Sequence, residues 1–586
     1  MGNELIRMEH VSYTYPGVDT PAVSDVSLCI EEGEIVLITG PSGAGKTTLC
    51  SMLNRIIPES YGGEIEGRIF IKGADISKYT IGQMAFISGL LFQDPSGQCT
   101  SATVGDEIAF GPENKGLPVD TVNALVDKYV GYVNMQSFLK RPPQALSGGQ
   151  QQSVIYSSVL AMEPEIYVLD EPTSNLDPLG SDLVFQLMKK VTRDHKKTAI
   201  IVEHKLEKII DMVDRIIVMD KGRIAFNGTP KEVLAHYKEL LGIGVVAPQI
   251  NQIVNRLNEE RRLSIPAPLT ITEAAESLKS ILPEKLPEKR MESVAETFPK
   301  PRTFDKPIIE IRDLHFAYNP EVEILHGINL NIYEGEFLSI VGQNGSGKTT
   351  IVKTFNGLHK PTGGSVLVKG IDTRNETVAK LSQSVGYCFQ NPDHQIFSSV
   401  VRDELTYGPK NVGMSAEETE KIVEEVSGMI GIEDILDENP YNLSKGQRQQ
   451  VAVAGILTMK PDVIIVDEPT TGQDPVQSHR MMDMVKRLNT EYGKTIVVIT
   501  HDMSIAAEYS DRIVTMHNGT IIAEGTPREV FCQEEMLNSS NLESPQVTRL
   551  LRMAGISEPV AINVEEAMEL LGQINFGKEA PSNGEQ

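Results

Sequence analysis

Cysteine, long apolar runs and basic residues are all scarce in this sequence of 586 residues. The five cysteines form no CxxC pair, which excludes by spacing a zinc ribbon or an iron–sulfur cluster and argues against a disulfide framework. Cysteine usage of this kind is typical of a reducing, cytoplasmic setting. The apolar stretches have the length of strands, and none reaches the ~18 residues of a membrane helix or forms the apolar core of a signal peptide. The sequence therefore predicts no membrane-spanning segment, although attachment to a membrane through a partner stays open.

Basic residues are outnumbered by acidic ones, 54 to 80, so the formal net charge is −26. Proteins whose main partner is nucleic acid carry a basic face, and this balance argues against such a partner, although it leaves room for a local basic patch. Hydrophobic residues make up 40% and charged residues 23%, which is the composition of a folded chain. A chain of this length is too long for one hydrophobic core, so several domains are expected.

Much of the sequence occurs twice. GPSGAGKT at 40–47 returns as GQNGSGKT at 342–349, and LSGGQ at 146–150 returns as LSKGQ at 443–447. From the glutamine of FQDPSGQ and FQNPDHQ onward the copies align at a constant offset of 297 residues (390 − 93, 444 − 147 and 468 − 171). We predict a duplicated domain. The expected boundaries are 5–245 for the first domain, 246–304 for its tail and a linker, 305–540 for the second domain and 541–586 for its tail.

The order of apolar runs indicates an α/β fold. Runs at 34–39 and 336–341 end at the two glycine-rich segments, and helical periodicity follows each of them. Strand–loop–helix is the context that a phosphate-binding loop requires. Further apolar runs, at 166–169 and 463–466 and at 198–202 and 495–499, alternate with helical segments, which indicates parallel sheets buried on both faces.

Both glycine-rich segments fit the pattern GxxxxGK[ST], whose backbone N–H groups turn toward the phosphates of a nucleotide. The lysine would contact the β- and γ-phosphate oxygens, and the following threonine would bind Mg²⁺. A glycine-rich turn that arose by chance is the alternative, but two such segments in the same context make it untenable. The predicted nucleotide-binding residues of the loops are Gly40, Pro41, Ser42, Gly43, Ala44, Gly45, Lys46, Thr47, Gly342, Gln343, Asn344, Gly345, Ser346, Gly347, Lys348 and Thr349.

An Asp-Glu pair ends a buried apolar run in each half. The aspartates, Asp170 and Asp467, are suited to hold Mg²⁺ directly or through water. The glutamates, Glu171 and Glu468, are placed to polarise an attacking water as general bases. The alternative is that Asp-Glu-Pro forms a turn that merely closes each strand.

Weaker signals recur in both halves. Gln93 and Gln390 could reach Mg²⁺ or the attacking water, or could be solvated loop residues. His204 and His501 follow the last β-branched run, where a neutral imidazole could bond to the γ-phosphate or serve only the structure.

A tyrosine precedes each phosphate loop. Tyr15 and Tyr318 could stack on adenine or lie in the core, and their recurrence at matching places favours stacking.

Assembled in this order, the motifs resemble those of the ATP-binding subunits of ABC transporters over nearly the whole chain outside the linker and tail. The resemblance implies two P-loop NTPase domains of the ABC ATPase type, with parallel-sheet cores, helical signature subdomains and small C-terminal tails, which hydrolyse ATP with Mg²⁺. LSGGQ is the most specific motif, because it separates this family from other phosphate-loop ATPases. The signature residues it assigns to nucleotide binding are Ser147, Gly149, Gln150, Ser444, Gly446 and Gln447.

Within that family, the segments QDPSGQ…VGDEIAFGPEN and QNPDHQIFSSVVRDELTYGPKN resemble importers of the energy-coupling-factor (ECF) type for cobalt and vitamins. This implies an energy-coupling subunit that drives uptake of a vitamin or metal ion from the cytoplasmic face of the cell membrane. The expected partners are an integral membrane coupling protein and a small substrate-binding membrane component. The resemblance does not identify the solute.

The family's mechanism implies that the two domains pair head to tail within the chain, with each ATP between one phosphate loop and the other domain's signature. Two residues depart from the family's pattern. Lys445 replaces a glycine, where it could hinder the backbone's approach or add charge near the γ-phosphate, and Ser153 stands where arginine is common. Since both glutamates are present, we expect both sites to hydrolyse ATP, at rates that need not be equal.

Three other functions compete with this interpretation. A soluble twin-domain ABC ATPase that acts on ribosomes or DNA would need basic surfaces, which the net charge disfavours. The ATPase of a sugar-type importer would share the chemistry, but the segment QNPDHQIF argues against it. A binding module without catalysis would lack lysine or glutamate in one half, and both are present.

Overall fold

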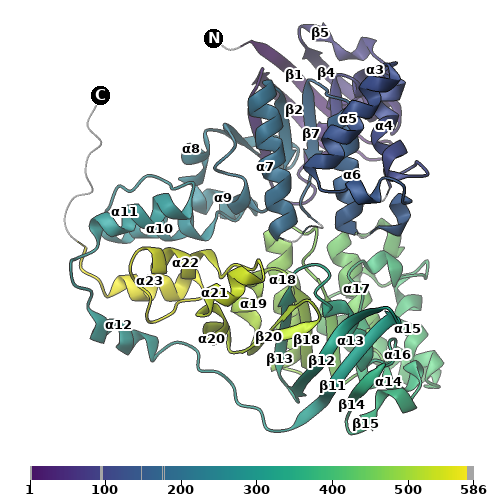
Figure 1. The fold of residues 1–586 in the computed structure, drawn as a ribbon, viewed down its shortest axis with the longest axis vertical. Coiled ribbons are helices and arrows are strands. Elements are labelled where there is room, and N and C mark those ends of the chain that lie inside the picture. Colours follow the sequence, from purple (N-terminus) through teal and green to yellow (C-terminus); the bar gives the residue numbers. More distant parts are fainter. Residues whose placement is uncertain (1–2, 93–96, 147, 175, 177, 577–586) are drawn as a thin grey trace. The chain divides into compact units, whose positions relative to one another are not determined.

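A computed structural model describes residues 3–92, 97–146, 148–174, 176 and 178–576 (Figure 1). The chain folds into two compact units that adjoin in the sequence between Ala274 and Ala275. None of the helices in the described ranges has the length and apolar character needed to cross a bilayer.

The first unit contains a six-stranded sheet of order β10-β9-β3-β8-β7-β6, in which only β10 runs antiparallel to its neighbour. Every residue of its strand β7 is buried, and alternate side chains of β7 enter two different hydrophobic clusters. This is the parallel sheet, buried on both faces, that the apolar runs predicted. The strands are β3 (Ile35–Thr39), β6 (Ser88–Leu91), β7 (Ile166–Asp170), β8 (Thr198–Val202), β9 (Arg215–Asp220) and β10 (Arg223–Gly228).

Helices cover one face of this sheet, and a second sheet lies over the other face together with α1. The second sheet, of order β2-β1-β4-β5, is antiparallel, and the sequence analysis did not predict it. Its strands are β1 (Glu4–Thr14), β2 (Val23–Glu31), β4 (Glu64–Ile71) and β5 (Ala74–Asp75). The main helices are α1 (Lys46–Leu53), α4 (Val104–Asn114), α5 (Val119–Tyr132), α6 (Gly148–Ala161) and α7 (Pro178–His195). Four more helices follow: α8 (Pro230–Leu234), α9 (Tyr237–Ile243), α10 (Gln249–Arg261) and α11 (Ile271–Ile281), which crosses the boundary between the units.

The second unit repeats this architecture, with sheets of order β16-β17-β18-β13-β19-β20 and β12-β11-β14-β15. Its strands are β11 (Pro307–Asn319), β12 (Val322–Tyr333), β13 (Phe337–Gly342), β14 (Gly363–Val368), β15 (Ile371–Asp372), β16 (Val385–Cys388), β17 (Val463–Asp467), β18 (Thr495–Thr500), β19 (Arg512–His517) and β20 (Thr520–Gly525). Its main helices are α13 (Lys348–Phe355), α15 (Val401–Asn411), α16 (Ala416–Ile430), α17 (Lys445–Leu457), α18 (Pro475–Thr490) and α19 (Met503–Tyr509). Four more helices follow: α20 (Pro527–Phe531), α21 (Glu534–Ser539) and, in the segment predicted as the tail, α22 (Gln546–Met553) and α23 (Val564–Gly572).

Part of the segment predicted as tail and linker packs on the second unit's tail. Helix α12 (Glu288–Ala295) lies against α23 (Figure 1), and its Met291 is buried. Phe298 lies just beyond α12 in the sequence, and the guanidinium of Arg528 is 4.7 Å from the centre of its ring. Arg528 also forms an ion pair with Glu566 of α23. The end of the predicted linker is therefore a structured part of the second unit, while the domain boundaries stay a prediction.

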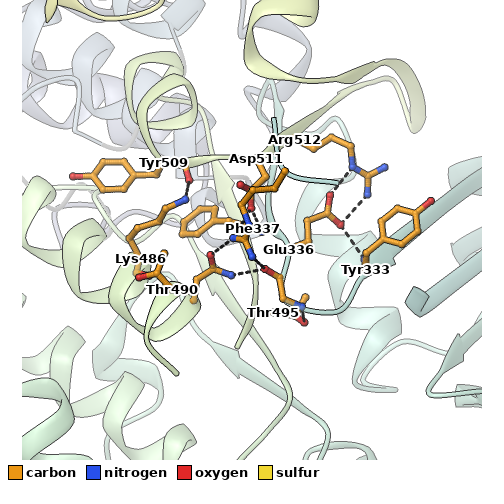
Figure 2. Close-up of polar contacts among 12 residues, drawn as sticks. Tyr333, Glu336, Phe337, Lys486, Thr490, Thr495, Tyr509, Asp511 and Arg512 are labelled. Carbon is orange, nitrogen blue, oxygen red and sulfur yellow. Dashed lines mark hydrogen bonds and ion pairs between the residues drawn. The ribbon is translucent and has the colours of Figure 1, made fainter. Parts of the chain in front are cut away.

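A buried ion pair ties two neighbouring strands of the second unit together (Figure 2). Glu336, just before β13, is 0% exposed and accepts two hydrogen bonds from Arg512 of β19, at 2.6 and 3.0 Å. Beside it, Asp511 accepts the backbone N–H of Phe337 at 2.9 Å. These contacts fix the start of β13, the strand that leads into the second phosphate loop.

Candidate functional site

The first phosphate loop runs from β3 into α1 and wraps around its own lysine. The Nζ of Lys46 donates to the carbonyl oxygens of Gly40 and Pro41 at 2.9 and 2.8 Å. Gly45, at the N-terminus of α1, has a φ of +96°, and a Cβ there would lie 2.3 Å from the carbonyl oxygen of Ala22. Only glycine fits such a position. Burial lowers the pKa of Lys46, and the nearby carboxylates of Glu171 and Asp170 oppose this shift.

The second loop, between β13 and α13, has the same construction. Lys348 donates from Nζ to the carbonyl oxygens of Gly342 and Gln343, both at 2.8 Å. Gly347 has a φ of +99° at the N-terminus of α13. Both motifs thus form the strand–loop–helix unit that the sequence predicted, with the helix N-terminus toward the loop, where an anion is favoured.

In the second unit the predicted Mg²⁺ ligands converge at the end of β17. The Oδ2 atom of Asp467 accepts hydrogen bonds from the hydroxyl of Thr349, at 3.0 Å, and from the hydroxyl of Tyr387, at 2.7 Å. Burial raises the pKa of Asp467. A hydroxyl and a carboxylate are oxygen ligands of the kind that Mg²⁺ takes, so this donor set fits the ion.

The first unit lacks the counterpart of Tyr387, because Leu90 occupies that position (387 − 297). In the described residues the Oδ1 atom of Asp170 is buried and has no hydrogen-bond partner. Burial raises the pKa of Asp170 to about 6, although the hydroxyl of Thr47 opposes this shift. An unsatisfied buried carboxylate oxygen beside a threonine hydroxyl also fits a divalent cation.

Both predicted general bases have an unusual backbone conformation. Glu171 and Glu468 have φ values of +48° and +47°, in the left-handed region that residues other than glycine rarely adopt. The backbone N–H of Glu171 donates to the carbonyl oxygen of Val202 in β8 at 3.0 Å, and that of Glu468 donates to the carbonyl oxygen of Ile499 in β18 at 2.9 Å. The neighbouring strand therefore holds each glutamate in a strained conformation, as is common at active sites.

The predicted histidines lie next to these glutamates. Nε2 of His204 lies 3.1 Å from Oε1 of Glu171, and Nδ1 of His501 lies 3.1 Å from Oε2 of Glu468. Burial opposes ionisation of Glu468, but the interaction with His501, together with that of Lys348, outweighs it and lowers its pKa to about 2. Glu468 is therefore a carboxylate at neutral pH.

Of the two glutamines predicted at the sites, the structure describes Gln390 only. Gln390 donates from Nε2 to Oε2 of Glu468 at 3.4 Å, which brings it to the predicted general base. Gln93 and the signature residue Ser147 lie outside the described residues.

The signature residues belong to other elements. Ser444 caps the N-terminus of α17, where its hydroxyl accepts from the backbone N–H of Gln447 and the side chain of Gln447 accepts in return. Gly446 lies in the first turn of α17, and Gly149 and Gln150 lie in the first turn of α6. Their part in nucleotide binding, and the pairing of the two domains, stay predictions.

The two tyrosines flank the phosphate-loop helices. The hydroxyl of Tyr15 lies 3.0 Å from that of Thr48 in α1, and the hydroxyl of Tyr318 lies 3.4 Å from that of Thr350 in α13. Tyr318 is 61% exposed, so its ring is open to a ligand. Stacking on adenine stays a prediction.

The sequence analysis missed residues that hold the site together. Tyr387 binds Asp467, and the hydroxyl of Thr471 donates to Glu468 at 2.9 Å. A second glutamine, Gln98 or Gln395, accepts the backbone N–H of the phenylalanine six positions earlier, at 3.0 and 3.1 Å. The recurrence of this glutamine in FQDPSGQ and FQNPDHQ was a usable signal, whereas Tyr387 and Thr471 occur in one half only.

The pKa of Asp170 predicts a pH dependence of Mg²⁺-assisted nucleotide binding. Because a ligand carboxylate must lose its proton to bind a metal, affinity at the first site should fall as the pH drops below about 6. We expect a loss of about tenfold per pH unit below that value. Nucleotide titrations of the Lys348→Ala variant, which disables the second loop, measure this. The same titrations in EDTA are the control, and an equal pH dependence there would contradict the role of Asp170.

Comparisons with known proteins agree with these motifs. The sequence profile of the family described as "ABC transporter" matches residues 23–174 and 325–471. A "Putative ABC transporter ATP-binding protein" of Methanosarcina acetivorans is 40% identical over 576 residues, which cover 97% of this chain and 93% of the relative. A protein of the same description from Caldanaerobacter subterraneus is 41% identical over 537 residues, covering 92% and 94%. Among solved structures, CbiO1 from Clostridium perfringens, described as part of the ABC transporter complex CbiONQ, is 36% identical. The match covers 42% of this chain and 100% of the CbiO1 chain, with a TM-score of 0.38.

Proposed function

Since the chain belongs to the ABC transporter family as a tandem ATP-binding protein, we propose that it is the energy-coupling subunit of an ECF-type import complex. Its ABC domains make it an ATP-hydrolysing enzyme that uses ATP and Mg²⁺. In the proposed complex it drives uptake of a vitamin or metal ion through an integral membrane coupling protein and a small substrate-binding membrane component. It would act as a peripheral protein at the cytoplasmic face of the membrane.

An exposed aromatic patch in the second unit carries this proposal. The patch consists of Phe397, Tyr407 and Tyr441, which are 58%, 53% and 56% exposed. The rings of Phe397 and Tyr407 meet edge to face with centres 4.6 Å apart, and the hydroxyl of Tyr441 donates to the carbonyl oxygen of Ile396. Large aromatic side chains gathered at a surface favour a protein partner.

The segment that presents the patch is held rigidly. The buried carboxylate of Glu404 accepts the backbone N–H groups of Phe397 and Ser398, at 3.1 and 2.9 Å. Phe397 lies seven residues after Gln390, which contacts the predicted general base Glu468. A change at the nucleotide site can therefore reach the patch through a short, hydrogen-bonded segment.

The first unit repeats this arrangement in part. Glu107 accepts the backbone N–H groups of Thr100 and Ser101 at 2.9 and 2.7 Å. Phe110, at the position of Tyr407 (407 − 297), is 56% exposed. Each half thus offers an aromatic side chain after its glutamine segment, as two contacts with one membrane partner would require.

Affinity purification of the tagged chain from native membranes in mild detergent, followed by mass spectrometry, tests the proposal. We expect one multi-span protein and one small membrane protein, and the small protein would indicate the solute. The variant Phe397→Asp/Tyr407→Asp should lose both, because charges on the patch disfavour an apolar contact. Tyr492→Asp, at another exposed tyrosine, is the matched control and should keep both. Recovery of ribosomes or nucleic acid instead would overturn the proposal in favour of a soluble twin-domain ATPase.

A further inference from the structure

A buried carboxylate that no motif covers lies beside the first site. Glu203 directly follows β8 and is 4% exposed. Its Oε2 atom accepts the hydroxyl of Thr173 at 2.6 Å, and its Oε1 atom accepts the backbone N–H groups of His204 and Lys205 at 2.8 and 3.3 Å. A buried carboxylate is tolerated only when its oxygens are bonded in this way, so Glu203 fixes the groups that bond to it.

Those groups come from both sides of the predicted catalytic pair. Thr173 lies in the turn that follows Glu171, and His204 is the histidine that contacts Glu171. Glu203 therefore clamps the turn after β7 to the end of β8, with Glu171 and His204 between them. The charged and titratable groups that face it are Glu171, His204 and the buried Tyr156 of α6.

The second unit is built differently at this point. Thr500 stands in place of Glu203 (500 − 297), and its hydroxyl accepts the backbone N–H of Asp502 at 2.9 Å. There the side chains of Thr471 and Gln390 bond to Glu468 directly.

In the first unit, Ser174 stands at the position of Thr471 (471 − 297). Among the described residues, its hydroxyl oxygen is buried and has no hydrogen-bond partner. The hydroxyl that holds the general base in the second unit thus does not do so in the first, where Glu203 supplies a different support.

We propose that Glu203 is a positioning residue of the first ATP site alone, where it holds His204, and through it Glu171, in the geometry for hydrolysis. It touches neither substrate nor metal in this assignment. The proposal rests on hydrolysis at the first site and not on the identity of the membrane partners, so failure of the importer assignment leaves it standing.

Steady-state ATPase measurements in a Glu468→Gln background test the proposal, because turnover then reports the first site. We expect Glu203→Ala to lower kcat by about tenfold or more, as befits lost hydrogen bonds to a charged group, while KM for ATP stays within about twofold. Glu203→Gln should recover much of this loss, since its amide oxygen still accepts the N–H groups of His204 and Lys205. Glu203→Thr, which copies the second unit, should resemble Glu203→Ala.

The matched control is Thr500→Ala in a Glu171→Gln background, where we expect kcat to change by less than about twofold. An unchanged kcat in Glu203→Ala, or an equal loss in the control, would overturn the proposal. A third result would also overturn it: Glu203→Ala lowers both kcat and the unfolding temperature, and Glu203→Gln does not restore kcat. That result would indicate a structural role only. A background chain without any turnover would overturn the premise of hydrolysis at the first site, and the proposal with it.

Discussion

ATP turnover should fall by at least about a hundredfold when Glu171 and Glu468 are both replaced by glutamine, because each site would then lack the carboxylate predicted to accept a proton from the attacking water. Glutamine keeps the size of the side chain and one hydrogen bond to the histidine, so the loss reports the missing base. Nucleotide binding should persist, since the lysines of both phosphate loops are untouched. Phosphate release and nucleotide titration measure the two effects separately.

The single variants decide whether both sites work. Glu171→Gln and Glu468→Gln should each lower turnover, and a variant without effect would mark its site as regulatory. Glu491→Gln, at an exposed position after α18, is the matched control and should keep full activity. A double variant that retained more than about a tenth of the activity would contradict the assignment of the two glutamates.

Loss of the Arg512 side chain should destabilise the second unit by about 3–5 kcal/mol. Arg512→Ala leaves the fully buried carboxylate of Glu336 without its cation, and an uncompensated buried charge is among the costliest defects in a folded protein (Figure 2). Hydrogen exchange should show the loss of protection first in β13 and β19, the strands that the pair joins. Denaturant unfolding gives the free energy of unfolding.

The first unit supplies the control for this prediction. Arg215 meets Glu34 through one contact of 3.4 Å, and the side chain of Glu34 is 14% exposed. Arg215→Ala should therefore cost less than Arg512→Ala. The double variant Glu336→Leu/Arg512→Met should recover much of the loss, because paired apolar side chains leave no buried charge. Equal destabilisation by the two arginine variants would contradict the argument from burial.

The sequence predicted those parts of the site that local pattern determines. The loops around Lys46 and Lys348, the acid pairs at the ends of β7 and β17, and the histidines after β8 and β18 all follow from strand-length runs that end in polar residues. Because the carboxyl ends of parallel strands meet at one edge of a sheet, these residues had to lie together. Their catalytic roles stay predictions.

Contacts that depend on packing between distant segments were not predictable in this way. Tyr387 is separated from Asp467 by 80 residues and Thr173 from Glu203 by 30, and neither pair recurs in the other half. The antiparallel sheets were missed because their half-buried strands alternate in polarity instead of forming continuous apolar runs. The sequence does place Glu203, a charged residue, at the end of an apolar run. A functional role was predicted only for the neighbouring His204.

The packing of α12 on α23 leaves only a short stretch of chain between α11, the last helix after the first ATPase domain, and α12. Helix α11 ends at Ile281 and α12 begins at Glu288, so residues 282–287 are the part of the chain that neither helix contains. Six residues span at most about 20 Å when fully extended. A tether of this length would keep the two ATPase domains at a local concentration in the millimolar range for each other, whatever the dilution of the protein. The predicted head-to-tail pairing of the two domains would thereby be insensitive to expression level, as it would not be for two separate chains.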